Sequence, residues 1–367
     1  MDKVLTFLNT VFVQGFWKTF CVKWVWQTFC VKWVWQTFCV KWVYQTFCKD
    51  LVGKKLRFNS WKGWIYLLPA IILLLIFTVY PIFNTVMMAF TNNYDSLESI
   101  GGTSFEFGID NFITVISSGD TFRTAILNTM LLCVVTVPLS TMLALLIAVA
   151  LNSIKPLQKF FQTIFFLPYV TNSIAIGMVF AALFDVVGDF SKPYLVESWG
   201  FINTLLGKIG VQPVNWLDGI GVFGDATYWP KFAVLVIYIV WNALPFKILI
   251  LLGGLQSVNK QYYEAAKIDS TPKWRVFTRI TVPLLSPMIA YVVITGFIGG
   301  FKEYTSIIGI FGDSMADGQL YTMVGFIYDA LPDAFYGEAS AAALILFAII
   351  FAVTMVNLYV SKKKTHY

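Results

Sequence analysis

The sequence has few of the residues that catalysis or metal binding needs. Its 367 residues include one histidine, His366, which lies next to the C-terminus. A single histidine excludes His-based catalytic triads and His metal clusters and leaves few general-base schemes. The sequence also lacks a GxxxxGK[ST] loop, so this chain cannot hold ATP phosphates by that route. These absences argue against an enzyme or an ATPase in this chain.

Charged residues are also scarce. They make up 13% of the chain, whereas globular proteins carry about 25%, and 58% of the residues are hydrophobic. The mean hydropathy is +0.72. This composition predicts an all-α polytopic membrane protein. The net charge of +6 does not indicate a nucleic-acid partner, because the basic residues are sorted by side of the membrane and do not form one binding face.

A nine-residue tandem repeat fills residues 19–49 of an N-terminal segment, 1–63, which we expect in the cytoplasm. It reads TFCVKWVWQ twice, TFCVKWVYQ once and ends with TFCK. A helix would rotate each copy by half a revolution, so tryptophans would lie on two opposite sides. A membrane-spanning helix would bury about two lysines at a cost of about 2.5–3.5 kcal/mol each. We therefore favour a helix lying in the plane of the lipid surface; a functionless tandem duplication is the alternative.

The cysteines of the repeat recur because the repeat recurs. Their nine-residue spacing fits no zinc pattern. Cys133 lies in an apolar segment and is interpreted as a small apolar residue. The sequence therefore predicts neither a metal site nor a disulfide framework. The repeat cysteines are Cys21, Cys30, Cys39 and Cys48.

Residues 64–360 contain apolar segments that are long enough to cross a bilayer. Polar loops are expected between them at Thr91–Asp120 and Val187–Lys231. Pro245 is expected to kink the fourth span, for gating or merely for packing. The six predicted spans are Trp64–Phe83, Ala125–Leu151, Phe161–Phe184, Phe232–Leu252, Leu284–Phe301 and Ala339–Val360.

The distribution of charge predicts the orientation. Six spans with both termini inside place 1–63, 152–160, 253–283 and the basic tail 361–367 in the cytoplasm. Those segments hold most of the 26 Lys and Arg residues. The only acidic residues in them are Asp2, Asp50, Glu264 and Asp269. This asymmetry satisfies the positive-inside rule.

One charged segment interrupts the apolar second half, at Tyr262–Pro287. Its EAAK run at 264–267 favours a helix. Pro272 disfavours helical geometry at the preceding residue, so we expect Thr271 to cap a second helix that begins with Pro272. Three apolar residues then recur at three-residue steps and predict one apolar stripe. They are Trp274, Phe277 and Ile280.

This segment resembles the EAA loop of membrane subunits in binding-protein-dependent ABC importers, whose pattern is EAAxxDGAxxxxxFxxIxxPxxxP. Ser270 and Thr271 stand where that family usually has Gly and Ala. Glycine enters the left-handed backbone region at little cost and serine does not, so a Thr-Pro start is another route to the turn. The matching residues are Glu264, Ala265, Ala266, Asp269, Phe277, Ile280, Pro283 and Pro287.

Other runs are similar to the sugar-importer group of the same family. They are LPYVTNSIAIGMVF from 167, INTLLGKIG from 202, NWL from 215 and WNALPFKILILLGGLQSV from 241. The resemblance covers about residues 64–360 and omits the repeat. It implies a type I importer permease core: half of the membrane channel of a maltose-type carbohydrate importer in a bacterial or archaeal cytoplasmic membrane.

The resemblance also implies partners. They are a second, related permease subunit, a dimer of ABC ATPase subunits and an extracytoplasmic solute-binding protein. ATP and Mg would be bound by the ATPase subunits, and no cofactor or metal is expected in this chain. In the family this loop docks in a cleft of the ATPase. The implied coupling residues are Glu264, Ala265, Ala266, Asp269, Ser270, Phe277 and Pro283.

Other interpretations remain open. An ATP-independent secondary transporter or channel would need acidic residues inside its spans, and these spans are nearly free of them. A membrane-bound enzyme would need a metal or nucleophile constellation, which the sequence lacks. The segment at 262–287 could also be an ordinary amphipathic cytoplasmic loop.

Polar residues at membrane depth are costly, so they usually face the bundle interior or a water-filled path. An aromatic ring beside an amide suits a sugar; hydrogen bonds between helices are the alternative role. Lys247 is expected to extend toward the cytoplasmic surface rather than to bind solute. The solute could be an oligosaccharide, a glycerol-phosphate-type sugar ester or another molecule. Candidate pathway residues are Asn172, Ser173, Trp241, Asn242, Thr295, Glu303 and Tyr304.

Overall fold

The computed structural model describes most of the chain after the N-terminal segment, in two units, Met1–Thr78 and Val79–Tyr367. The nine-residue repeat, and with it the predicted in-plane helix, lies outside the described residues. The ranges described are 60–92, 106–154, 158–188, 196–217, 227–312, 315–316 and 318–364.

The described part of the first unit is helical. Helix α5 (Ser60–Leu74) runs directly into a π-helical turn, η4 (Leu75–Val79). The large apolar side chains along α5, among them Leu67, Leu68 and Leu73, are exposed. Tyr66–Ala89 is long and apolar enough to cross a membrane, and it contains most of the first predicted span.

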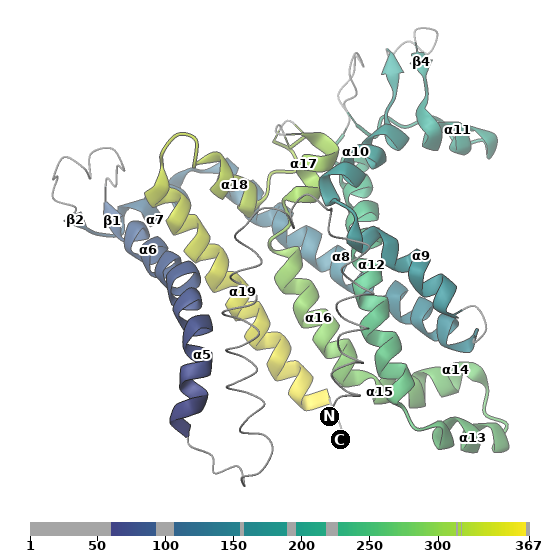
Figure 1. Cartoon of the computed structure of the whole chain (residues 1–367). Helices are drawn as coiled ribbons and strands as arrows, with labels where there is room; N and C mark the ends of the chain where they lie inside the picture. Colours follow the sequence, from purple (N-terminus) through teal and green to yellow (C-terminus); the bar gives the residue numbers. More distant parts are fainter. Residues whose placement is uncertain are drawn as a thin grey trace, which may run out of the picture. The chain divides into compact units, whose positions relative to one another are not determined.

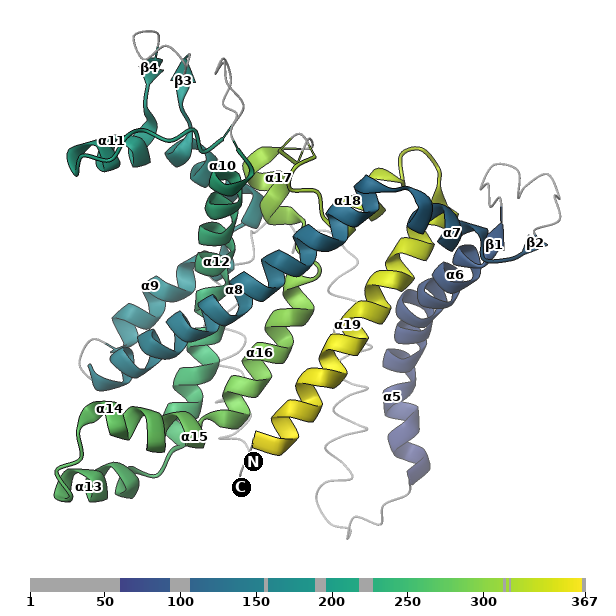
Figure 2. The same ribbon diagram turned by 180° about the vertical axis from the view of Figure 1, so that it is seen from behind.

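Long helices form the frame of the second unit (Figures 1 and 2). Helix α12 packs along α8, α16 packs against both α8 and α19, and α6 packs against α19. Among the described residues of the whole chain, four helices are long and apolar enough to cross a membrane, or up to six if each bent pair is one span. The bounds are α6 (Tyr80–Ala89), α8 (Asp120–Ser153), α12 (Tyr228–Ser257), α16 (Ser286–Gly300) and α19 (Tyr336–Lys364).

The third predicted span is broken in the structure. Helices α9 (Gln158–Val170) and α10 (Ser173–Phe184) meet at an angle of 99°. The Asn172 side chain caps α10 by accepting hydrogen bonds from the backbone N–H groups of Ile174 (2.9 Å) and Ala175 (3.4 Å). The cap satisfies N–H groups that the start of a new helix would leave unpaired, so the chain can break sharply inside an apolar segment.

The fifth predicted span is preceded by a chain of short helical segments. The stretch Lys273–Leu284 meets α16 at 69°. Pro245, by contrast, lies inside the single continuous helix α12. The short segments are α13 (Lys260–Ile268), α14 (Lys273–Val276), the π-helical η7 (Phe277–Thr281) and α15 (Val282–Leu284).

Segments predicted as polar loops hold short elements of their own. Strand β1 (Thr91–Asn92) pairs antiparallel with β2 (Glu106–Phe107), and β3 (Val187–Gly188) pairs antiparallel with β4 (Val196–Ser198). The short helices in these two segments are α7 (Asp110–Ser117) and α11 (Gly200–Lys208). Two more short helices, α17 (Thr305–Phe311) and α18 (Met323–Asp329), lie between the fifth and sixth predicted spans. The fold is nevertheless all-α in its architecture.

Small residues allow α8 to approach its neighbours closely. Ala144 and Ala148 of α8 are fully buried in a cluster with Leu251 and Leu252 of α12. Ala125, near the start of the same helix, is fully buried in a cluster that includes Ala341 and Ala342 of α19. Helix contacts in membranes favour small residues because van der Waals contact, not exclusion of water, holds the helices together.

Asn128 on α8 ties three segments together. Its Nδ2 donates to the backbone carbonyls of Gln319 (2.8 Å) and Tyr321 (2.9 Å). Its Oδ1 accepts a hydrogen bond from the Tyr228 hydroxyl at 3.0 Å. The side chain is 5% exposed, so these bonds replace water that cannot reach it.

Candidate functional site

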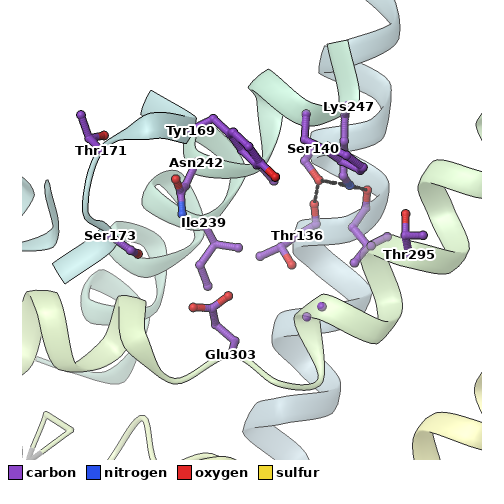
Figure 3. Close-up of a pocket in the computed structure, with 16 residues that line it drawn as sticks. Thr136, Ser140, Tyr169, Thr171, Ser173, Ile239, Asn242, Lys247, Thr295 and Glu303 are labelled. Atoms are coloured by element: carbon purple, nitrogen blue, oxygen red, sulfur yellow. Dashed lines mark hydrogen bonds between the residues drawn. The ribbon is translucent and has the colours of Figure 1, made fainter. Parts of the chain in front are cut away.

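A cavity of about 440 Å³ lies among the long helices of the second unit (Figure 3). Its volume falls within the range of about 300–1,000 Å³ typical of small-molecule sites. Helices α8, α12 and α16, the α9–α10 break and the turn after α16 supply its walls. The lining residues are Thr136, Val137, Ser140, Tyr169, Thr171, Ser173, Ile239, Asn242, Ala243, Phe246, Lys247, Thr295, Gly296, Gly299, Gly300 and Glu303.

The structure brings four of the seven predicted pathway residues to this cavity, namely Ser173, Asn242, Thr295 and Glu303. The other three were each predicted beside a residue that does line it. Residues adjacent in a helix point about 100° apart, so the neighbour of a lining residue can face another element instead.

The remaining three predicted residues have other contacts. Asn172 caps α10. The Trp241 ring packs against Phe180, with ring centroids 5.3 Å apart. The Tyr304 ring stacks on Tyr328 at 4.6 Å with an interplanar angle of 9°. In the described structure these three residues are not part of the cavity lining.

The prediction for Lys247 was wrong. The side chain is 5% exposed and its amine lies in the cavity wall instead of extending to a membrane surface. Its Nζ donates to Ser140 Oγ (2.6 Å), Thr141 Oγ1 (3.0 Å) and the backbone carbonyl of Val137 (3.3 Å). These oxygens on α8 accept from all three N–H groups of the amine, so the side chain needs no water at a membrane surface to complete its hydrogen bonds.

Sequence reasoning missed the polar face of α8. Thr136 and Ser140 lie one helical turn apart and both line the cavity, and Thr141 adjoins them. The signal was available, because these hydroxyls also interrupt an apolar span. Serine and threonine are easily overlooked in this role, since they can bond to carbonyls of their own helix, as all three do here.

Glu303 enters the cavity from the turn between α16 and α17. Its Oε1 accepts a hydrogen bond from the Ser306 N–H at 3.3 Å, at the start of α17. Figure 3 shows its carboxyl group directed into the cavity and set apart from the Lys247 amine. The cavity therefore presents an acidic group and an amine from different walls.

An aromatic wall and a glycine surface complete the cavity. The rings of Tyr169 and Phe246 lie parallel within 18°, with centroids 6.1 Å apart. On α16, Gly296, Gly299 and Gly300 present backbone rather than side chains. A flat ring face and exposed backbone suit a solute that has both C–H surfaces and hydroxyl groups.

The turn between α13 and α14 keeps the left-handed form. The Ser270 N–H bonds to the Lys267 carbonyl (3.1 Å), and the Thr271 N–H bonds to the Ala266 carbonyl (2.9 Å). These two bonds define a Schellman motif, with Ser270 at φ +50° in the position that usually holds glycine. The turn is therefore not made by a separate Thr-Pro route.

The predicted helix cap was off by one residue. Helix α14 begins at Lys273, and Pro272 occupies the cap position with ψ 143° and no side-chain cap. The Pro272 carbonyl accepts from the N–H groups of Arg275 and Val276. Thr271 is already used by the Schellman motif, so its backbone belongs to the end of α13.

The α13–α14 pair presents a largely exposed surface in the described structure. Ile268 is 84% exposed and Trp274 is 71% exposed, whereas Ala266 is buried. Tyr263 and Thr281 hydroxyls lie 3.3 Å apart and connect α13 to η7. Of the predicted coupling residues, Ala266 is buried, Phe277 is half-buried, and Glu264, Ala265, Asp269, Ser270 and Pro283 are exposed.

Comparisons with known proteins agree on one family. The family described as "Binding-protein-dependent transport system inner membrane component" matches residues 137–366. The lactose transport system permease protein LacF of Rhizobium radiobacter is 28% identical over 305 residues, covering 82% of this chain and 93% of that protein. The trehalose/maltose transport system permease protein MalF of Thermococcus litoralis is 27% identical over 310 residues, covering 84% and 96%.

A solved structure shares the fold. It is a bacterial ABC transporter involved in the import of the acidic polysaccharide alginate, with a TM-score of 0.67 at 23% identity. The match covers 84% of this chain and 97% of that chain.

Proposed function

Because the chain belongs to the family of binding-protein-dependent transport system inner membrane components, we propose that it is a permease subunit of an ATP-driven carbohydrate importer. It would form half of a translocation pathway, with a second, related permease forming the other half. Two ATPase subunits would bind ATP and Mg and would do the hydrolysis, and an extracytoplasmic binding protein would deliver the solute. The chain itself would transport and would catalyse no reaction.

One observation carries the proposal: the exposed α13–α14 pair directly connects two walls of the cavity. Helix α12 contributes Asn242 and Lys247 to the cavity and ends just before α13. Helix α16 contributes Thr295 and the glycine surface and begins just after α15. A displacement of the pair would therefore act on both walls at once.

The mechanism follows from that connection. Closure of the ATPase dimer would move the docked α13–α14 pair, and the helices around the cavity would rock between inward-facing and outward-facing arrangements. This is rigid-body alternating access. The basic residues of the segment, Lys267, Lys273, Arg275 and Arg279, favour a cytoplasmic position, where the ATPase subunits would be.

A carbohydrate is the solute class that the relatives' names and the lining favour together. The two relatives described above carry lactose or trehalose and maltose in their names. The Tyr169–Phe246 wall can stack on the C–H face of a sugar ring, while Asn242, Ser173 and Glu303 can bond to its hydroxyls.

An affinity pull-down of this chain from its native membranes, followed by mass spectrometry, tests the proposal. We expect an ABC ATPase, a second permease with an EAA loop and a solute-binding protein to co-purify. A chain that purifies alone, and stays folded alone, would contradict the ATP-driven importer and favour an ATP-independent transporter.

A further inference from the structure

We propose that the cavity takes a carbohydrate that carries a carboxylate or phosphate group, with Lys247 as the residue that selects for the negative charge. This inference rests on the proposed function and names the solute class within it. The hydrogen bonds of the Lys247 amine go to neutral oxygens and do not balance its charge.

The Lys247 amine is surrounded by neutral oxygens. Within the described residues it forms no ion pair; its bonds go to Ser140 Oγ, Thr141 Oγ1 and the Val137 carbonyl. A buried cation without a counter-charge is costly, and in proteins such a charge is usually paired. A solute anion would supply the missing charge each time the cavity is occupied.

The hydroxyl groups around the amine orient toward it without neutralising it. The Ser140 hydroxyl donates to the Thr136 and Val137 carbonyls, and the Thr141 hydroxyl donates to the Val137 carbonyl. Their lone pairs are therefore directed to the amine. The bond to the Val137 carbonyl, at 3.3 Å, is the longest of the three and the easiest to exchange for an anionic solute oxygen.

Glycines on α16 shape the cavity wall near the amine. A Cβ at Gly296 would lie 3.2 Å from Lys247 Nζ and 3.0 Å from Val137 Cγ1, so a larger residue there would press on both side chains. One turn further, a Cβ at Gly299 would meet nothing within 4 Å. Both glycines line the cavity that holds the amine, and the room that the α16 wall leaves for a solute is at Gly299.

Glu303 would fix the orientation of the solute in the cavity. Its carboxyl group lies apart from the amine in the same cavity (Figure 3). Carboxylate oxygens accept hydrogen bonds from sugar hydroxyls and repel a second anion. A sugar with one acidic group would therefore place that group toward Lys247 and its hydroxyls toward Glu303, with a ring face available to the Tyr169–Phe246 wall.

Four pyranose probes of nearly equal size test the inference: glucose, glucuronate, glucose 1-phosphate and glucosamine. The complete transporter complex, without the binding protein, is placed in lipid nanodiscs, and dissociation constants are measured by saturation-transfer NMR titration. We expect at least one of the two anions to bind about 10-fold or more tightly than glucose. Glucosamine should bind more weakly than the preferred anion, and the ranking of glucuronate and glucose 1-phosphate tells a carboxylate solute from a phosphate solute.

A variant pair locates the effect. Lys247→Met keeps an unbranched side chain of similar length and removes its charge, so the affinity for the preferred anion should fall about 10- to 100-fold while that for glucose changes little. Lys302→Met removes an exposed lysine next to Glu303 that does not line the cavity, and its affinities should match the wild type.

Two results would overturn the inference, and neither depends on the variants folding. One is a wild-type complex that binds glucose as tightly as both anions. The other is a wild-type complex that binds none of the four probes. In either case the importer assignment is judged separately, by whether the ATPase and second permease co-purify, so the two proposals can fail independently.

Discussion

Helices α10 and α17 cross at a pair of glycines, and this crossing makes a strong prediction for Gly177→Ala. A Cβ at Gly177 would lie 2.7 Å from the carbonyl carbon and 2.8 Å from the Cα of Gly309. Both are backbone atoms that no rotamer change can move, so the two helices must separate. Overpacking of this kind costs about 1–3 kcal/mol, and the better helix propensity of alanine returns at most about 1 kcal/mol.

We therefore expect Gly177→Ala to lower the free energy of unfolding by about 1–2 kcal/mol. The change should also alter the cavity, because α10 begins with the lining residue Ser173 and α17 follows Glu303. The assay is thermal unfolding of the purified complex, where 1 kcal/mol lowers Tm by about 2–4 °C in domains of moderate size.

Gly207→Ala is the matched control. Gly207 lies in helix α11, and a Cβ there would meet nothing within 4 Å. Its Tm should stay unchanged or rise, since alanine is favoured over glycine in a helix by about 1 kcal/mol. If Gly177→Ala is as stable as Gly207→Ala, the close contact between α10 and α17 does not exclude a Cβ at position 177.

Three further predictions follow from individual contacts. Ser270→Gly should stabilise the α13–α14 turn by about 1 kcal/mol, because glycine has no Cβ in the left-handed region, and limited proteolysis of the turn should slow; faster cleavage would contradict this. Asn128→Ala should lower the free energy of unfolding by about 1–3 kcal/mol, because it removes the three hydrogen bonds of this buried side chain. Its Tm is compared with that of Asn152→Ala, and equal Tm values would contradict this prediction. Burial and the hydrogen bond to Asp329 raise the pKa of Tyr321 above its ordinary value of 10.0. The contribution of the neutral Tyr321 hydroxyl to stability should therefore be complete below pH 10 and be lost as the pH rises further. The measurement is Tm as a function of alkaline pH for the wild type and Tyr321→Phe, and an equal loss of Tm in the two proteins would contradict this.

The spans could be predicted from the sequence because hydropathy depends on composition alone. A window average, however, does not register a change of direction, so the α9–α10 break was not predicted. Its signals are local: Pro168, and Asn172 in a position to cap a new helix. The same asparagine was interpreted as a pathway residue, because an amide at membrane depth suits either role.

Residues of the cavity could be predicted from the sequence only where their own polarity distinguished them from their neighbours in the chain. Ser173, Asn242, Thr295 and Glu303 are conspicuous as polar residues in apolar surroundings, and the cavity includes them. The position of Lys247 depends on Ser140 and Thr141, which lie 107 and 106 positions away in the sequence. No local pattern carries that information, since it arises only when α8 and α12 pack side by side.

The left-handed turn at Ser270 could not be predicted from the conformational preference of serine. Residue type gave the correct energetic preference, but the Schellman bonds of Thr271 and Ser270 outweigh the penalty of placing a serine at φ +50°. The pattern of the EAA loop was a better guide to this geometry than the propensity of one residue.

In the proposed mechanism the exposed α13–α14 pair couples ATP hydrolysis to movement of the cavity walls. The most direct measurement is ATP-driven solute uptake, with ATP hydrolysis recorded in parallel, by the complete complex reconstituted in proteoliposomes. Ala265→Leu places bulk on an exposed face of α13, and Glu106→Gln changes an exposed residue of β2 as a control. We expect uptake to fall about 10-fold or more in Ala265→Leu while hydrolysis continues, and we expect both rates of the control to be unchanged. Full uptake in a correctly assembled Ala265→Leu complex would contradict the coupling role of this helix pair.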